Sequence, residues 1–196
     1  MNDNVNDRRV RKTKKALREG LSILMIEKNI KDITVRELTD LVDLNRGTFY
    51  LHYKDVYELK QQIENDIISE ITLIFNEYMP EKQGERPYPL FVTLLTYIQE
   101  NATICRMLLS SNSGRTFLDK LSEFIEIQCL KRWLEHFRPQ ADSDELAYFS
   151  IFAVTGYIAI IGRWLESDMK TSLEELALMM ERVGTYGIGF LDKAKS

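Results

Sequence analysis

The chain has 196 residues, of which 44% are hydrophobic and 29% are charged, and its formal net charge is −4. These values exclude a disordered chain and indicate a globular, largely helical protein of one or two domains. Two cysteines, expected to be buried thiols, and two histidines are too few and too scattered to form a metal site, so no metal or cofactor is expected. The polar, acidic segment 1–7 is unlike a signal peptide, which predicts a cytoplasmic protein.

Charge is unevenly distributed along the chain. Residues 1–54 contain twelve Lys and Arg against eight acidic residues, a net charge of +4, whereas the remainder carries −8. The densest basic run is RRVRKTKK at residues 8–15. Because DNA phosphates attract Lys and Arg, only the N-terminal part suits a nucleic-acid partner, although such a run is equally compatible with a solvated helix face.

Apolar residues at helical spacing predict a first helix over about residues 7–28. A capping box follows, in which Thr34 would cap a second helix and Glu37 would reach back to it. The pattern is interrupted at residues 43–45, and a short third helix is expected at about residues 46–51. Two short helices joined by a tight turn and braced by a longer helix form a helix-turn-helix, whose second helix enters the major groove of DNA.

The third helix carries side chains that suit DNA. Gly47 costs about 1 kcal/mol relative to Ala inside a helix, which indicates either close approach of a DNA strand or simply a glycine at a helix end. Polar and basic residues around it project outward, whereas Phe49 and Tyr53 are expected to face inward. Lys54 comes just before the cap sequence of residues 55–58, where the positive end of the next helix would favour an anion.

The segments TVREL at residues 34–38 and LNRGTFYLHYKD at residues 44–55 resemble the DNA-binding signature of the tetracycline-repressor (TetR) family, over about residues 9–60. The resemblance implies an all-α protein, with an N-terminal three-helix helix-turn-helix DNA-binding domain and a C-terminal helical effector-binding and dimerisation domain. It also implies base contacts from Arg46, Gly47 and Tyr50, and phosphate contacts from Thr34, His52 and Lys54.

Three positions in this signature leave alternatives open. Leu51 replaces a frequent aromatic or polar residue and Val56 replaces a frequent Lys, which puts DNA contacts from those two positions in doubt. His52 could instead be a packed histidine that is hydrogen-bonded within the domain.

The two domains are expected at residues 1–54 and 55–196, with a helix over 55–79 connecting them. A loop at residues 80–87 follows, and the remaining helices are expected at about residues 90–100, 102–109, 116–137, 143–166 and 172–191.

Residues 146–162 carry no charge and approach the minimum length of a membrane span, but the Ser, Thr and Tyr among them favour a helix buried by protein. A partner subunit could cover one face of this helix, since small residues here and in the last helix would let another helix come close. The predicted dimer interface consists of Ala153, Gly156, Ala159, Gly162, Gly184 and Gly187. A wholly intramolecular core is the alternative.

Aromatic and soft side chains of the second domain could line a pocket for an apolar or planar effector. These residues are Phe91, Tyr97, Met107, Phe117, Phe124, Trp133, Phe152 and Trp164. Helical spacing does not separate the wall of a cavity from a filled interior, so a plain core is the alternative for each of them.

The sequence therefore predicts a DNA-binding transcriptional regulator, which acts as a ligand-responsive homodimeric repressor on a palindromic operator. Its expected partners are double-stranded DNA, a second copy of itself and a small-molecule effector, with no membrane involved. The alternative is a TetR-like helical adaptor that acts mainly through protein-protein interaction. An enzyme is the weakest hypothesis, because the sequence has no Gly-rich phosphate loop after a strand and no nucleophile in a catalytic motif.

Overall fold

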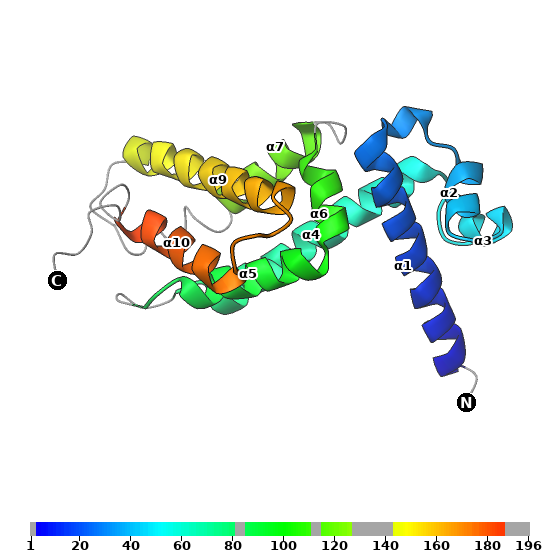
Figure 1. Ribbon diagram of the computed structural model, residues 1–196, viewed down its shortest axis with the longest axis horizontal. Coiled ribbons are helices and arrows are strands. Elements are labelled where there is room, and N and C mark those ends of the chain that lie inside the picture. The colour runs from blue at the N-terminus through cyan, green and yellow to red at the C-terminus, as the bar shows by residue number, and fades with distance from the viewer. Residues whose placement is uncertain (1–2, 81–84, 111–114, 127–142, 187–196) are drawn as a thin grey trace. The chain divides into compact units, whose positions relative to one another are not determined.

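A computed structural model describes residues 3–80, 85–110, 115–126 and 143–186 of the chain. These residues form nine α-helices and one short 3-10 helix, with no β-strand among them (Figure 1). The predicted all-α fold is confirmed. The helices are α1 (Asp3–Glu27), η1 (Ile30–Asp32), α2 (Val35–Leu41), α3 (Arg46–Tyr50), α4 (Val56–Tyr78), α5 (Tyr88–Glu100), α6 (Ala102–Leu109), α7 (Arg115–Phe124), α9 (Ser143–Glu166) and α10 (Leu173–Tyr186).

Most helix ends lie within a few residues of the expected positions, because the sequence marks them with caps. At α10, Ser172 and Glu175 form the reciprocal capping box: the Glu175 amide donates to Ser172 Oγ and the Ser172 amide donates to the Glu175 carboxylate, both at 3.3 Å. Helix α1 begins about four residues earlier than expected. The expected ends of the helices near residues 137 and 191 lie outside the described residues.

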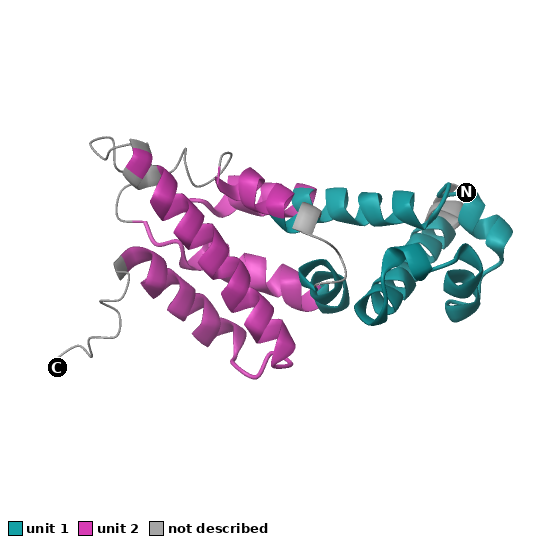
Figure 2. Cartoon of the chain, turned by 90° about the horizontal axis from the view of Figure 1, so that it is seen from above, with its two compact units in different colours: residues 1–68, 101–118 teal, residues 69–100, 119–196 magenta. Residues whose placement is uncertain are grey.

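The chain divides into two compact units (Figure 2). The first contains residues 1–68 and 101–118, and the second contains residues 69–100 and 119–196. Helix α6 therefore belongs to the same unit as α1, and α4 is shared between the two units. This division is based on contacts between helices. The expected boundary between residues 54 and 55 instead separates a DNA-binding domain from a regulatory domain, and it stays a prediction.

In the first unit, α1 is the central helix and contacts both α2 and α6. Its buried side chains Leu17, Leu21 and Met25 form one core with fully or almost fully buried side chains of the other helices, namely Leu38, Phe49, Leu59, Ile63, Met107 and Leu108. Gly20 sets the approach of α1 to α2: a Cβ at this position would lie 3.0 Å from Leu38 Cδ1 and closer still to Val42 Cγ1. A glycine in the middle of α1 is therefore needed for close packing.

In the second unit, α5 packs against α10. The Arg86 guanidinium, just before α5, forms a two-point ion pair with the Glu181 carboxylate of α10, whose side chain is only 4% exposed. Tyr157 of α9 donates a hydrogen bond to the Met180 carbonyl at 3.1 Å, and its ring centroid is 5.1 Å from that of Phe91. Burial raises the pKa of Tyr157 to about 12.

Residues 147–166, which form most of α9, are long and apolar enough to cross a membrane by length and composition. A single such helix is weak evidence for a membrane protein, because the core helix of a soluble protein has the same properties.

Candidate nucleic-acid interface

Thr34 begins the helix-turn-helix by capping α2. Its backbone is extended (φ −103°, ψ 152°) and its Oγ1 accepts a hydrogen bond from the Glu37 amide at 3.1 Å. The second half of the expected capping box is different, because the Glu37 carboxylate pairs with Lys28 Nζ and ties α2 to the residue that follows α1. The Thr34 side chain is exposed, and a hydroxyl that accepts one bond still has a hydrogen to donate, for instance to a phosphate.

The turn between α2 and α3 has a defined geometry. Asp43 adopts a left-handed conformation (φ 52°), which Asp tolerates better than most residues, and the Leu44 amide donates to the Thr39 carbonyl at 2.9 Å. Asn45 then caps α3 by accepting a hydrogen bond from the Gly47 amide at 2.8 Å. These local bonds fix where the third helix starts.

Gly47 is exposed in the first turn of α3. A Cβ at this position would lie 3.3 Å from Asn45 Oδ1, a tight contact with the side chain that caps the helix. The cap therefore gives a local reason for glycine, beside the reason that DNA would give. Its exposure leaves the backbone accessible to a close partner, so the predicted base contact stays a prediction.

Helix α3 has one buried and one exposed face. Phe49 is fully buried and Tyr53, just beyond the helix, is 6% exposed, with their ring centroids 5.8 Å apart. Burial raises the pKa of the Tyr53 hydroxyl. On the other face, Arg46 is exposed and the Tyr50 side chain is 59% exposed, packed edge-on against Phe49 at 5.5 Å. The inward prediction for Phe49 and Tyr53 is confirmed, and the base-contact candidates are accessible.

The N-terminus of α4 differs from the expectation of a vacant anion site. Asp55 Oδ1 accepts a hydrogen bond from the Glu58 amide at 2.9 Å, and Glu58 Oε2 accepts one from the Lys54 amide at 2.5 Å. Two carboxylates thus occupy the positive end of this helix. A phosphate contact from Lys54, whose side chain is exposed, must therefore come from its ammonium group rather than from the helix end.

The three doubtful positions have different surroundings. Val56 is 4% exposed, so its side chain belongs to the core of the unit. Leu51 is 80% exposed just after α3. His52 is partly exposed, with its ring centroid 6.3 Å from that of Tyr53, and both of its expected roles stay open.

Sequence reasoning missed the residues that brace α4 against α1. The Arg18 guanidinium forms an ion pair with the Asp66 carboxylate, and Gln62 Nε2 donates to the other Asp66 oxygen at 2.7 Å. No local pattern marks this pair, because its members are 48 residues apart. Gly20 could have been found, since it carries the same signal as Gly47, a glycine inside a predicted helix.

The expected effector-pocket residues are distributed over both compact units, and the predicted pocket stays a prediction. Phe91 and Trp164 are buried and Tyr97 and Phe124 are partly exposed in the second unit, whereas Met107 and Phe117 are buried in the first. The structure places Phe152 at the surface, 67% exposed, so in the single chain it does not line an enclosed pocket. Trp133 lies outside the described residues.

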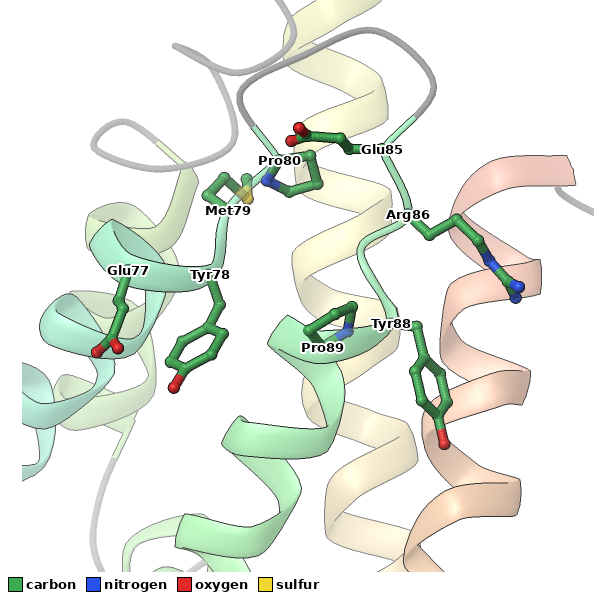
Figure 3. Close-up of a pocket in the computed structure, with 8 residues that line it drawn as sticks. All are labelled: Glu77, Tyr78, Met79, Pro80, Glu85, Arg86, Tyr88 and Pro89. Atoms are coloured by element: carbon green, nitrogen blue, oxygen red, sulfur yellow. The ribbon is translucent and has the colours of Figure 1, made fainter.

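The second unit has an open hollow of about 560 Å³ at the end of α4 and the start of α5. It is lined by Glu77, Tyr78, Met79, Pro80, Glu85, Arg86, Tyr88 and Pro89, none of which was expected to line a pocket (Figure 3). In this view the Arg86 side chain extends towards α10, in agreement with its ion pair to Glu181.

The expected dimer residues also differ among themselves. Ala159 is exposed, and a Cβ added at Gly156 or Gly162 would meet no described atom within 4 Å. Ala153 is 8% exposed and faces its own chain, and a Cβ at Gly184 would overlap the Tyr157 hydroxyl, at less than 3.0 Å. Gly187 lies outside the described residues. Packing against Tyr157 therefore accounts for the glycine at position 184, whereas no described part of the chain accounts for the glycines at positions 156 and 162.

Comparison with known proteins identifies the class. A TetR family model for the transcriptional regulator C-terminal region matches residues 85–185, just over half of the chain. No curated protein matches the sequence.

Three solved structures share the fold. A TetR transcriptional regulator from Streptococcus agalactiae is 22% identical with a TM-score of 0.59, and the match covers 93% of this chain and 99% of that one. The fatty acid degradation regulator FadR from Bacillus halodurans is 12% identical with a TM-score of 0.67, covering 90% and 96%. A transcriptional regulator of the TerR/AcrR family from Aquifex aeolicus is 19% identical with a TM-score of 0.62, covering 87% and 96%.

An all-α chain with a capped helix-turn-helix and a matching C-terminal region is a transcriptional regulator. It belongs to the TetR family.

Proposed function

We propose that this regulator is a cytoplasmic homodimeric repressor, which binds a palindromic operator and loses or gains affinity when a small molecule binds. The observation that carries the proposal is that α3 has one buried face and one exposed face. Its Phe49 side is buried, while Arg46 and Tyr50 are exposed on a helix whose start is fixed by the Asn45 cap. A short helix held in this way can present donors to base edges in the major groove.

The surrounding residues support separate sets of base contacts and phosphate contacts. Arg46, Gly47 and Tyr50 would contact bases, and the exposed Thr34 and Lys54 side chains, together with the partly exposed His52, would contact phosphates. Phosphate contacts orient the protein and base contacts give sequence preference. DNA binding should therefore weaken steeply with salt, because each phosphate contact releases counterions.

Homodimer formation is supported by the exposed surface of α9. Tyr148 and Phe152 are 75% and 67% exposed, on a helix that would otherwise be expected in a core. Glycine inside a helix costs about 1 kcal/mol relative to Ala, and no described residue of the chain accounts for Gly156 or Gly162. A second copy packed along α9 would cover the aromatic side chains and use the space at the glycines. A twofold axis would then give two α3 helices for two half-sites.

Response to an effector is supported by two further features. The open hollow in the second unit has a volume within the range of ligand sites. In the first unit, α6 contacts α1, the helix that also contacts α2. A ligand that favours one arrangement of these helices would shift the population of dimers whose recognition helices are spaced roughly 34–36 Å apart, as successive major grooves require.

The test is a selection of genomic DNA fragments by the purified protein at moderate salt. We expect enrichment of a palindromic sequence, and its absence, with or without added protein partners, would contradict the repressor and favour the adaptor. Binding of the selected operator should then be repeated with libraries of apolar and planar small molecules, where a shift in affinity identifies an effector.

A further inference from the structure

The N-terminal half of α1 is a charged surface that the proposed DNA contacts leave unused. Six of the eight residues from 8 to 15 are Lys or Arg, and the sequence has no acidic residue between Asp7 and Glu19. All six of these cations are exposed: Arg8, Arg9, Arg11, Lys12, Lys14 and Lys15.

This part of the helix has little core to stabilise it, and the Lys15–Glu19 ion pair at 3.8 Å adds little stability because both side chains are solvent-exposed. Among the side chains described from residue 8 onward, the first buried one in α1 is Leu17. Figure 1 shows the first turns of α1 running clear of α2 and α3. Like charges four residues apart destabilise a helix, and Arg8 with Lys12 and Arg11 with Lys15 are two such pairs. A polyanion along this surface would remove that repulsion.

Helix geometry gathers the cations on one side. At about 100° and 1.5 Å per residue, Arg8, Arg11, Lys12 and Lys15 fall within about 100° of each other over a length of about 10 Å. Arg9 adjoins this group, and the five residues are called the basic stripe. Double-stranded DNA carries one charge per about 1.7 Å of its axis, so a stripe of this length faces several phosphates.

We infer that the basic stripe is a second DNA contact, which binds backbone phosphates of the duplex that flanks the bases read by α3. The inference rests on the proposed function, because the same duplex is the partner. The stripe and α3 belong to one compact unit, so one duplex could contact both of them. Its Lys and Arg side chains would add affinity and salt dependence without adding sequence preference.

The experiment compares two variants that lose the same charge. The stripe variant is Arg8→Gln, Arg9→Gln, Lys12→Gln. The control variant carries three Gln substitutions at exposed Lys and Arg of the second unit, namely Lys120→Gln, Lys170→Gln and Arg182→Gln. Each protein is titrated onto the selected operator over a salt series, once with and once without about 10 bp of flanking duplex on each side.

On the flanked operator, the stripe variant should bind at least tenfold more weakly than wild type at low salt. The slope of log K against log salt should fall by up to about 2.7, which is 0.9 for each of three phosphate contacts. The control variant should bind as wild type does. Trimming the flanks should weaken wild type and control but leave the stripe variant unchanged. Circular dichroism should show no loss of thermal stability, because all six substituted side chains are exposed.

Three results would overturn the inference. Equal slopes for the stripe and control variants would make the stripe a solvated surface. An equal loss of affinity on trimmed and flanked DNA would place the stripe on the operator itself rather than beside it. If wild type selects no palindrome at all, the proposed function fails and the inference fails with it, which separates that result from the first two.

Discussion

Tyr50 and Lys54 suit different parts of DNA, and their substitution should separate base reading from phosphate binding. Tyr50→Ala should lower operator affinity by about 1–3 kcal/mol and reduce discrimination against altered operators. Lys54→Ala should weaken all DNA sequences alike and reduce the salt slope by about 1. Both side chains are exposed, so helical content should not change. Anisotropy titrations with operator and scrambled duplexes test this, and an unchanged operator affinity of Tyr50→Ala would contradict the base contact.

Thr34 has a structural role that must be separated from its expected phosphate contact. Its hydroxyl caps α2, so Thr34→Ala would cost about 1 kcal/mol of stability whether or not DNA is bound. Asp is an equally good cap, and it places a negative charge where a phosphate would lie. Thr34→Asp should therefore keep the free energy of unfolding and still lose DNA affinity. Urea unfolding and DNA titration of this one variant test both statements, and wild-type DNA affinity would argue against a phosphate at this position.

At the scale of helices, Gly184 and Tyr157 couple α10 to α9. Gly184→Ala alone should destabilise the protein by about 1–3 kcal/mol, because the new methyl group would overlap the Tyr157 hydroxyl. Tyr157→Phe alone should cost about 1 kcal/mol, since it removes the hydrogen bond to the Met180 carbonyl. In the Tyr157→Phe background the overlap is gone, and the helix preference of Ala over Gly, about 1 kcal/mol, should make Gly184→Ala neutral or stabilising.

A double-mutant cycle by urea unfolding measures this coupling. Additive effects of the two substitutions would show that Gly184 does not accommodate Tyr157, and would return Gly184 to the candidates for a contact between subunits.

The elements that sequence predicted well are those with local causes. The caps at Thr34 and Ser172 involve residues three positions apart, so the pattern that encodes them is readable directly from the chain. The contact of α6 with α1 joins segments far apart in the sequence, and no local sequence pattern predicts it. The assignment of α6 to the first unit therefore required the structure.

The face that a helix buries was harder to predict when the helix is apolar all round. In α9, Ala153 is buried while its neighbour Phe152 is 67% exposed. Hydrophobicity alone does not show which face of such a helix is buried, because every face carries apolar residues. For α3 the buried face was clear, since Phe49 and Tyr53 are four residues apart and flanked by polar residues, and the inward prediction was correct.

The free energy of unfolding of the whole chain should fall in alkaline solution. Burial raises the pKa of the Cys105 thiol from 9.0 to about 12 and that of Tyr157 from 10.0 to about 12. Both groups ionise earlier in the unfolded chain, so stability is complete below pH 9 and falls by up to about 1.4 kcal/mol per pH unit for each group as the pH rises towards 12. Urea unfolding along this range gives the profile. Cys105→Ala should delay the fall to pH 10, and an unchanged onset would contradict the assignment to the thiol.

The exposed surface of α9 makes the oligomeric state the property that decides how the molecule works. One α3 helix offers few base contacts, whereas a twofold dimer doubles them and requires a palindrome. Phe152→Glu should convert the dimer to a monomer, because it places a charge in the centre of the proposed interface. Leu73→Glu is the matched control, since Leu73 is 59% exposed on α4 and the chemical change is the same.

Gel filtration with light scattering at micromolar concentration measures the masses. We expect a dimer for wild type and Leu73→Glu, and a folded monomer for Phe152→Glu, with normal helical content because the side chain is at the surface. The monomer should bind a half-site only weakly, because it loses the second recognition helix and half of the phosphate contacts. A wild-type monomer would contradict the homodimer, and a Phe152→Glu dimer would move the interface away from this face of α9.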